Sequence, residues 1–223
     1  FTELKRLFQE LVKKQLYIPT EIKYSLLDID NIDDAYNNTI QIQRINYERV
    51  IKDNDINVIK EVSELIIKAS RVYICSQGMS RVIAEYLNSR LKLINIDSRM
   101  VEIGELLASS IELERATKKA CLILISFPKY SHNVIGLSEY LTQNHIPFIS
   151  ITDSDKSPLV KNSEHVLKCY SDSLVFHNFI SSTICLVEIL LVILSFNMKS
   201  NLMLHLDNLE QIQASLMKNI NNE

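Results

Sequence analysis

The 223-residue sequence lacks an excess of basic residues, since its 24 lysines and arginines are outnumbered by 27 aspartates and glutamates, for a formal net charge of −3. A protein held to nucleic acid by its bulk charge has a strong positive field, so the chain as a whole falls outside that class. A separate basic module is not excluded. The length suffices for one sizeable core, and we expect one main domain.

The sequence also lacks paired cysteine spacings and an export signal. No CxxC spacing occurs, and three of the four cysteines lie in strongly apolar runs (Cys75, Cys121, Cys169, Cys185). This pattern predicts reduced core cysteines in a cytoplasmic protein. We also expect no metal site and no cofactor. The start of the chain has no basic stretch followed by an apolar core and a cleavage site. Phe1 in place of Met predicts that the sequence begins inside a longer protein.

The longest apolar run, residues 174–196, has the length of a membrane span but not its composition. It contains His177, Asn178 and Glu188, and no basic residue flanks it immediately on either side. We therefore expect a helix buried at a domain core or a subunit contact, and no membrane partner.

The first quarter of the chain carries helical patterns around one irregular segment. Residues 1–16 place apolar side chains on one face and basic ones largely elsewhere, which predicts a short amphipathic helix. The segment 17–30 contains Pro19 and no sustained period, which is typical of a linker. Helices are expected next over 33–51 and 55–69, and Asn54 is the expected cap of the second one.

From residue 71 onward, short apolar runs alternate with helical patterns. The runs predict five strands (71–75, 98–103, 120–126, 147–152, 165–170), and the helical patterns lie between them (79–93, 104–115, 133–144, 157–162). Parallel strands need crossover connections, which are usually helices. The alternation therefore predicts an α/β fold, a three-layer α-β-α sandwich with a five-stranded parallel sheet and additional N-terminal and C-terminal helices.

Two of the predicted strand ends have side chains suited to an anion. The first strand runs into Ser76-Gln77-Gly78-Met79-Ser80 at the head of a helix, whose first N–H groups are free to bind a phosphate. Plain capping of the helix explains such a turn as well. The third strand leads to Ser126, Pro128, Lys129 and Ser131, again before a helix. If the two strands are neighbours, both loops converge on one phosphate.

These segments resemble the SIS (sugar isomerase) domain, in the version found in RpiR-type bacterial transcription regulators, over about residues 54–197. The family's first loop usually follows Gly-x-Gly-x-Ser, matched here by Ser76, Gly78 and Ser80. Its second loop follows Ser-x-Ser-Gly-x-Thr, where this chain has Ser126, Pro128, Lys129 and Ser131. The resemblance implies a phosphosugar site, for which we expect these binding residues: Ser76, Gln77, Gly78, Met79, Ser80, Ser126, Lys129, Ser131 and His177.

The resemblance also implies a domain plan. Residues 1–27 are expected to be the remnant of a helix-turn-helix DNA-binding module with its linker, and 28–53 a linker helix. The phosphosugar-binding domain spans 54–197, and 198–223 form a C-terminal helix. That last helix has no obvious place in the sandwich, so a homodimer or higher oligomer is expected. DNA would be bound through the part of the module that the sequence lacks.

Three functions remain open at this stage. A sugar-phosphate isomerase needs an acid and a base in one pocket, and the candidates form no motif (Glu102, Glu105, His132, His177, Glu188). We therefore prefer a sensor that is not an enzyme, in which a bound phosphosugar shifts how two subunits present their DNA readers. A degenerate scaffold that only dimerises is the third possibility.

Overall fold

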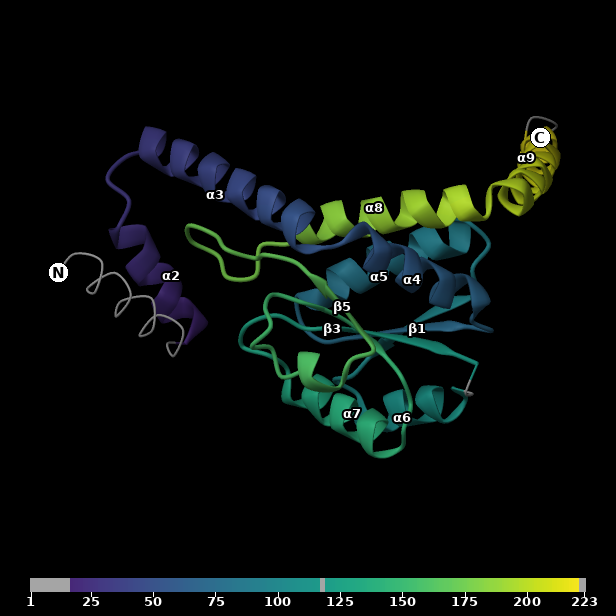
Figure 1. The fold of residues 1–223 in the computed structure, drawn as a ribbon. Coiled ribbons are helices and arrows are strands. Elements are labelled where there is room, and N and C mark those ends of the chain that lie inside the picture. Colours follow the sequence, from purple (N-terminus) through teal and green to yellow (C-terminus); the bar gives the residue numbers. More distant parts are fainter. Residues whose placement is uncertain (1–16, 117–118, 221–223) are drawn as a thin grey trace.

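The computed structural model of the chain describes residues 17–116 and 119–220 (Figure 1). Its centre is a sheet of five parallel strands in the order β2-β1-β3-β4-β5. The predicted amphipathic helix over residues 1–16 lies outside the described residues. The strands are β1 (Val72–Ser76), β2 (Ser98–Glu102), β3 (Cys121–Ile125), β4 (Ile149–Thr152) and β5 (His165–Lys168). Four lie within the predicted apolar runs, and β1 extends one residue beyond its run, to Ser76, so the predicted parallel sheet is confirmed.

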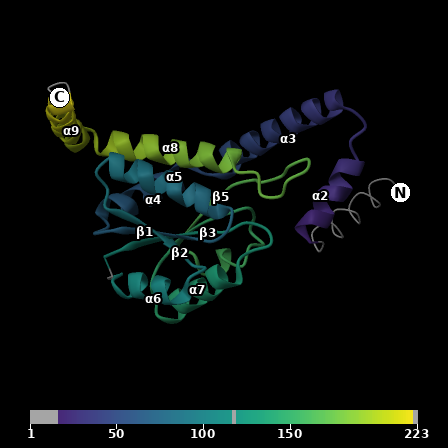
Figure 2. The same cartoon turned by 180° about the vertical axis from the view of Figure 1, so that it is seen from behind.

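Helices cover both faces of the sheet. One face carries α4 (Ile56–Lys68), α5 (Ser80–Leu93) and α8 (Ser181–Asn197), and the other carries α6 (Leu106–Glu114) and α7 (His132–Gln143) (Figures 1 and 2). The three-layer sandwich predicted from the alternating pattern is therefore confirmed.

Side chains of β1 show why the central strands have apolar residues on both faces. Val72 and Ile74 lie in the hydrophobic cluster beneath α4, α5 and α8, whereas Tyr73 and Cys75 lie in the cluster on the opposite face. Successive residues of a strand point to opposite faces, so a strand buried between two helical layers needs apolar residues on both faces instead of at alternate positions only. The cysteines follow this rule, because all four are free and three are buried.

Three local predictions are wrong. The segment 17–30 contains a helix, α2 (Ile18–Leu27), because Pro19 sits in the first turn, where the missing N–H costs nothing. The helix expected over 157–162 is only the 3₁₀ turn η1 (Val160–Asn162). The apolar run 174–196 becomes helical only from Ser181.

The junction of α3 (Ile32–Asp53) and α4 corrects a further prediction. Asp55, and not Asn54, caps α4, since its carboxylate accepts a hydrogen bond from the Asn57 N–H at 2.7 Å. The Asn54 amide instead donates to the Val50 and Lys168 carbonyls and accepts from the Lys168 N–H at 2.8 Å. Asn54 thus fastens the end of α3 to β5.

Two helices extend beyond the sandwich. Figure 1 shows α3 reaching past the sheet, with α2 folded back toward the strand-end loops, while α9 (Lys199–Ile220) lies at the far end of α8. The axes of α8 and α9 differ by 94°. The two helices have the length and hydropathy of a membrane span only when taken together as this bent pair. Within the described residues, no single helix is long and apolar enough to cross a membrane.

Candidate functional site

The sheet order brings the two predicted loops together. β1 pairs with β3 in parallel register, so Ser76 lies beside Ile125 and both strands end at the same edge of the sheet. The chain leaves β1 toward β2 on one side and reaches β3 on the other, which makes this edge a topological switch point. A cavity of about 890 Å³ lies there and is lined by both loops.

The first loop places backbone close to the cavity through Gly78. Its φ of +63° lies in the left-handed region, which glycine adopts without steric cost. Helix α5 begins two residues later at Ser80, and no side chain among residues 17–116 and 119–220 caps its free N–H groups. Gln77, Gly78, Met79 and Ser80 all line the cavity, and Ser80 is buried.

The second loop is joined to the first through Ser131. The Ser131 hydroxyl donates a hydrogen bond to the Gln77 amide oxygen and accepts one from the Val134 N–H at 3.3 Å, so Ser131 is the N-cap of α7. The Ser131 N–H in turn donates to the Ser126 hydroxyl at 3.4 Å. Ser126 and Ser131 both line the cavity. Three serine hydroxyls and two helix N-termini therefore converge on one space.

Lys129 and Tyr130 complete the second loop. Lys129 has a φ of +63° and forms an ion pair with Glu21 of α2, a contact that the sequence did not suggest. The Tyr130 hydroxyl donates to the Asp153 carboxylate at 2.6 Å. Burial, and then this hydrogen bond, raise the pKa of Tyr130, so the phenol stays protonated.

The two remaining predicted site residues, His177 and Ser76, differ in whether they line the cavity. His177 lines the cavity, and its neighbour Asn178 donates to the Pro128 carbonyl at 2.9 Å. Ser76 does not line the cavity. It is fully buried at the end of β1, and its hydroxyl has no hydrogen-bond partner within the described part of the chain.

Sequence reasoning missed part of the lining. Ile18, Phe127 and Asn178 line the cavity alongside the predicted residues. Phe127 lies between two candidate residues of the second loop, so its position in the sequence was a usable signal. Ile18 belongs to the segment taken for a linker, and no local pattern connects it to a loop more than a hundred residues away.

The carboxylates considered for catalysis lie elsewhere. Glu102 forms an ion pair with Arg81 at 3.2 Å, and Glu188 accepts a hydrogen bond from the Tyr86 hydroxyl at 2.9 Å. Neither of them, nor Glu105, lines the cavity, whereas His132 does. Among the described residues, no group of three or more histidine, cysteine or acidic side chains is placed to hold a metal ion.

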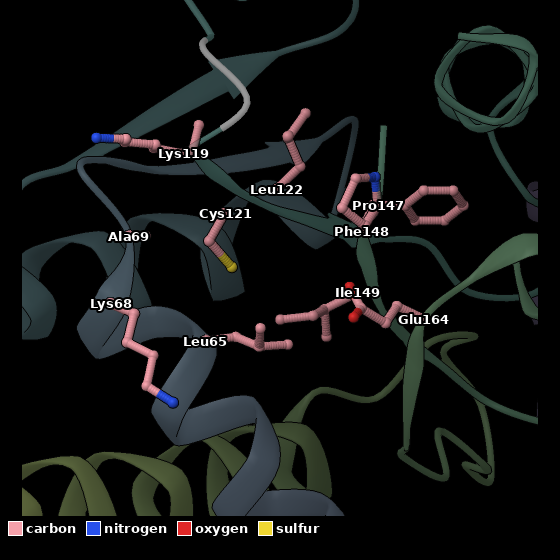
Figure 3. A pocket seen from close by; sticks show the side chains of 11 residues that line it. Leu65, Lys68, Ala69, Lys119, Cys121, Leu122, Pro147, Phe148, Ile149 and Glu164 are labelled. Carbon is pink, nitrogen blue, oxygen red and sulfur yellow. The ribbon is translucent and has the colours of Figure 1, made fainter. Parts of the chain in front are cut away.

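A second cavity, of about 260 Å³, lies at the opposite edge of the sheet, near the amino ends of β3 and β4 (Figure 3). Its walls are largely apolar side chains such as Leu65, Leu122 and Phe148. The charged groups at its rim include Lys68, which pairs with Glu64 at 2.8 Å. It lacks the helix N-termini and serine hydroxyls of the larger cavity, which we take as the candidate site.

Comparison with protein families agrees with this geometry. The family model of the SIS domain matches residues 65–193, more than half of the chain. The chain belongs to the SIS-domain family. The matched region contains all five strands and both loops of the site. A comparison with curated proteins finds no match to this SIS-domain chain.

Solved structures share the fold of this SIS domain. The sugar isomerase domain of an RpiR transcription factor from Sphaerobacter thermophilus has a TM-score of 0.71 and 20% identity, over 80% of this chain and 97% of its own. The Vibrio vulnificus NanR protein complexed with ManNAc-6P has a TM-score of 0.69 and 17% identity, covering 90% and 76%. A phosphoheptose isomerase from Francisella tularensis has a TM-score of 0.56 and 16% identity, covering 73% and 95%. The fold is thus found in regulators and in enzymes.

Proposed function

We infer that this chain is the effector-sensing part of an RpiR-type DNA-binding transcription regulator and binds a sugar phosphate in the strand-end cavity. The observation that carries this is the convergence of Ser80, Ser126 and Ser131 on one cavity at the heads of α5 and α7. Free N–H groups and the positive ends of the helix dipoles favour a phosphate there. A volume of about 890 Å³ leaves room for the sugar.

The shape of the lining supports a sugar phosphate over a bare anion. Polar groups gather at the loop junction, while Ile18, Met79 and Phe127 give the same cavity apolar walls. A small-molecule site commonly combines a mostly apolar wall with a few placed polar groups. The hydroxyls and amides would bind the phosphate, and His177 and Asn178 are within the lining to contact sugar hydroxyls.

We prefer a cavity that binds a sugar phosphate without converting it. A ketose–aldose isomerisation needs a base beside the substrate carbon, typically a carboxylate. The described residues that line the cavity include His132 and His177 but no carboxylate. An isomerase remains the second candidate, because these two histidines are available and enzymes share the fold.

A route from the cavity to the N-terminal helices supports a regulatory role. Asn178, which lines the cavity, lies on the segment between β5 and α8 and holds the Pro128 carbonyl. On the same segment, the Asp172 carbonyl accepts a hydrogen bond from Asn46 of α3 at 2.8 Å. A ligand that moves this segment would therefore move α3, which leads toward the expected DNA reader.

The effect of the ligand would reach the expected DNA reader through a homodimer. Apolar side chains remain exposed along α8 and α9 of the single chain, among them Val192, Phe196, Leu204, Ile212 and Leu216. Exposed apolar stripes of this kind mark contact surfaces, and a second copy of the chain is the simplest partner.

Calorimetric titration with ManNAc-6P and with a panel of hexose and pentose phosphates tests the assignment. We expect saturable binding that weakens about tenfold in Ser80→Ala and in Ser126→Ala, because each loses a hydrogen bond to a charged group. Ser110→Ala is the matched control, since Ser110 is an exposed serine of α6 whose hydroxyl donates to the Leu106 carbonyl of its own helix. Equal affinities in all these variants would place the ligand elsewhere.

The same panel separates the alternatives. Turnover of a ketose or aldose phosphate, followed by NMR, would favour the isomerase. Dimers that bind no member of the panel would indicate a scaffold and overturn the sensor assignment.

A further inference from the structure

Helix α2 lies against the candidate site although it is distant from it in sequence. Ile18, its first residue, lines the cavity, and Glu21, one turn later, forms an ion pair with Lys129 of the second loop. Figures 1 and 2 both show α2 beside the loops at the carboxyl ends of the strands. The pair joins residues 108 apart in sequence, so it holds the helix to the sensor domain.

The ion pair takes up the positive charge that a phosphate would need. Among the described residues that line the cavity, Lys129 is the only lysine or arginine. Its side chain is 28% exposed. The Glu21 side chain is 18% exposed. Charges withdrawn this far from water attract one another more strongly than surface charges do. The cavity is therefore close to neutral at Lys129 while α2 is in place.

Within the part of the chain that the structure describes, little else fastens α2. Ser25 is its buried residue, whereas Tyr24, Leu26 and Leu27 are exposed. A helix that buries few apolar side chains opens at small free-energy cost, so one partly buried ion pair is a large part of what holds it. Displacing Glu21 from Lys129 would release the helix.

We propose that the Glu21 carboxylate occupies Lys129 in the ligand-free chain and that the phosphate of a sugar phosphate displaces it, releasing α2. The phosphate dianion and the carboxylate repel each other at one ammonium group, so they compete instead of binding together. This proposal rests on the proposed function and gives it a second output. Helix α2 directly follows residues 1–16, the segment assigned from sequence to the DNA-binding module, so its release changes how that module is held.

The variant Glu21→Gln tests the competition, with Glu48→Gln as control. Glu48 is an exposed acid of α3 that pairs with Arg44, so both variants remove one negative charge and one ion pair from a flanking helix. In calorimetry with ManNAc-6P and with inorganic phosphate, Glu21→Gln is expected to bind about three- to tenfold more tightly than the wild-type chain, because the competing ion pair is lost. Glu48→Gln is expected to match the wild-type chain.

Hydrogen exchange of the α2 amides provides the structural readout. ManNAc-6P should increase exchange across residues 18–27 of the wild-type chain, and Glu21→Gln should show the increase without ligand. Equal affinities of the two variants, or ligand-induced protection of α2, would overturn the displacement while leaving the sensor function intact. Absence of binding to every variant would overturn both proposals.

Discussion

The Ser131 hydroxyl donates a hydrogen bond to the amide oxygen of Gln77, joining two strand-end loops that are 54 residues apart in sequence. The other side of the same amide lies against the turn after β2, where a Cβ added at Gly104 would come within 3.3 Å of the Gln77 Nε2. Gln77 therefore connects three strand-end turns. The cavity owes its shape to this side chain as well as to the backbone of the loops.

Replacing Gln77 with alanine should loosen the junction without unfolding the domain. The Ser131 hydroxyl loses its acceptor but still caps α7, so we expect a loss of about 1 kcal/mol in the free energy of unfolding. Affinity for ManNAc-6P should fall more than stability does, because the loops no longer hold one arrangement. Urea denaturation and calorimetry measure the two effects. Gln143→Ala, an exposed glutamine at the end of α7, should change neither.

The two glycines Gly78 and Gly136 should respond in opposite directions to alanine. Neither has a heavy atom within 4 Å of an added Cβ, so packing cannot distinguish them. Gly78 has a φ of +63°, where alanine costs about 1 kcal/mol or more. Gly136 lies inside α7, where alanine gains about 0.5–1 kcal/mol. Thermal unfolding of both variants checks the pair, and a loss at Gly136 would show that its backbone is not held as a helix.

The sheet and the loops were predictable because they depend on local pattern. Strands such as Cys121–Ile125 are apolar at every position, and the loop chemistry of Ser80 and Ser131 follows the strand ends in the sequence. Even the convergence of the loops followed from one topological condition, that β1 and β3 be neighbours.

What escaped prediction depends on contacts between distant segments. Helix α2 has an apolar pattern too weak to distinguish it from a linker, and its place over the cavity depends on Glu21 meeting Lys129. Ser76 occupies a motif position, yet the depth to which β1 is buried keeps its hydroxyl out of the cavity. Asn54 was expected to cap α4, but its binding to Lys168 requires β5, 114 residues later.

Replacing Asn54 at the end of α3 should lower the free energy of unfolding. Asn54→Ala removes three hydrogen bonds and leaves the Lys168 N–H without its side-chain acceptor. We expect a loss of about 2–3 kcal/mol in the free energy of unfolding, measured by urea denaturation. Asn57→Ala, an exposed asparagine in the first turn of α4, is the control and should cost under about 0.5 kcal/mol. Equal losses of unfolding free energy in Asn54→Ala and Asn57→Ala would mean that the hydrogen bonds between Asn54 and Lys168 do not stabilise the fold.

The buried thiols should be inert in the folded chain. Burial raises the pKa of Cys75 and of Cys169 from 9.0 to about 12, so both remain protonated at pH 8. Alkylation with iodoacetamide, followed by mass spectrometry, should leave both unmodified until urea unfolds the chain. Because the unfolded chain loses these protons near pH 9 and the folded chain does not, their stabilising effect is complete below pH 9 and falls as the pH rises toward 12. Rapid labelling of Cys75 at pH 8 would contradict this.

The exposed face of α9 should decide the oligomeric state. Leu204, Ile212 and Leu216 are exposed in the single chain, and at 100° per residue they fall within about a third of the helix circumference. A glutamate at Ile212 places a charge in the middle of this face, which a helix–helix contact would have to bury without a partner. We therefore expect Ile212→Glu to shift the protein from dimer to monomer in sedimentation velocity.

The neighbouring Gln211→Glu supplies the control for that experiment, because it adds the same charge to the same helix at an exposed polar position. It should sediment like the wild-type chain. Circular dichroism should show equal helix content in both variants, since the sheet sandwich is complete without the tip of α9. If both sediment unchanged as dimers, the contact lies elsewhere and α8, where Val192 and Phe196 are also exposed, becomes the surface to substitute. If the wild-type chain is already a monomer, the relay through a homodimer fails, whereas binding of the sugar phosphate does not depend on it.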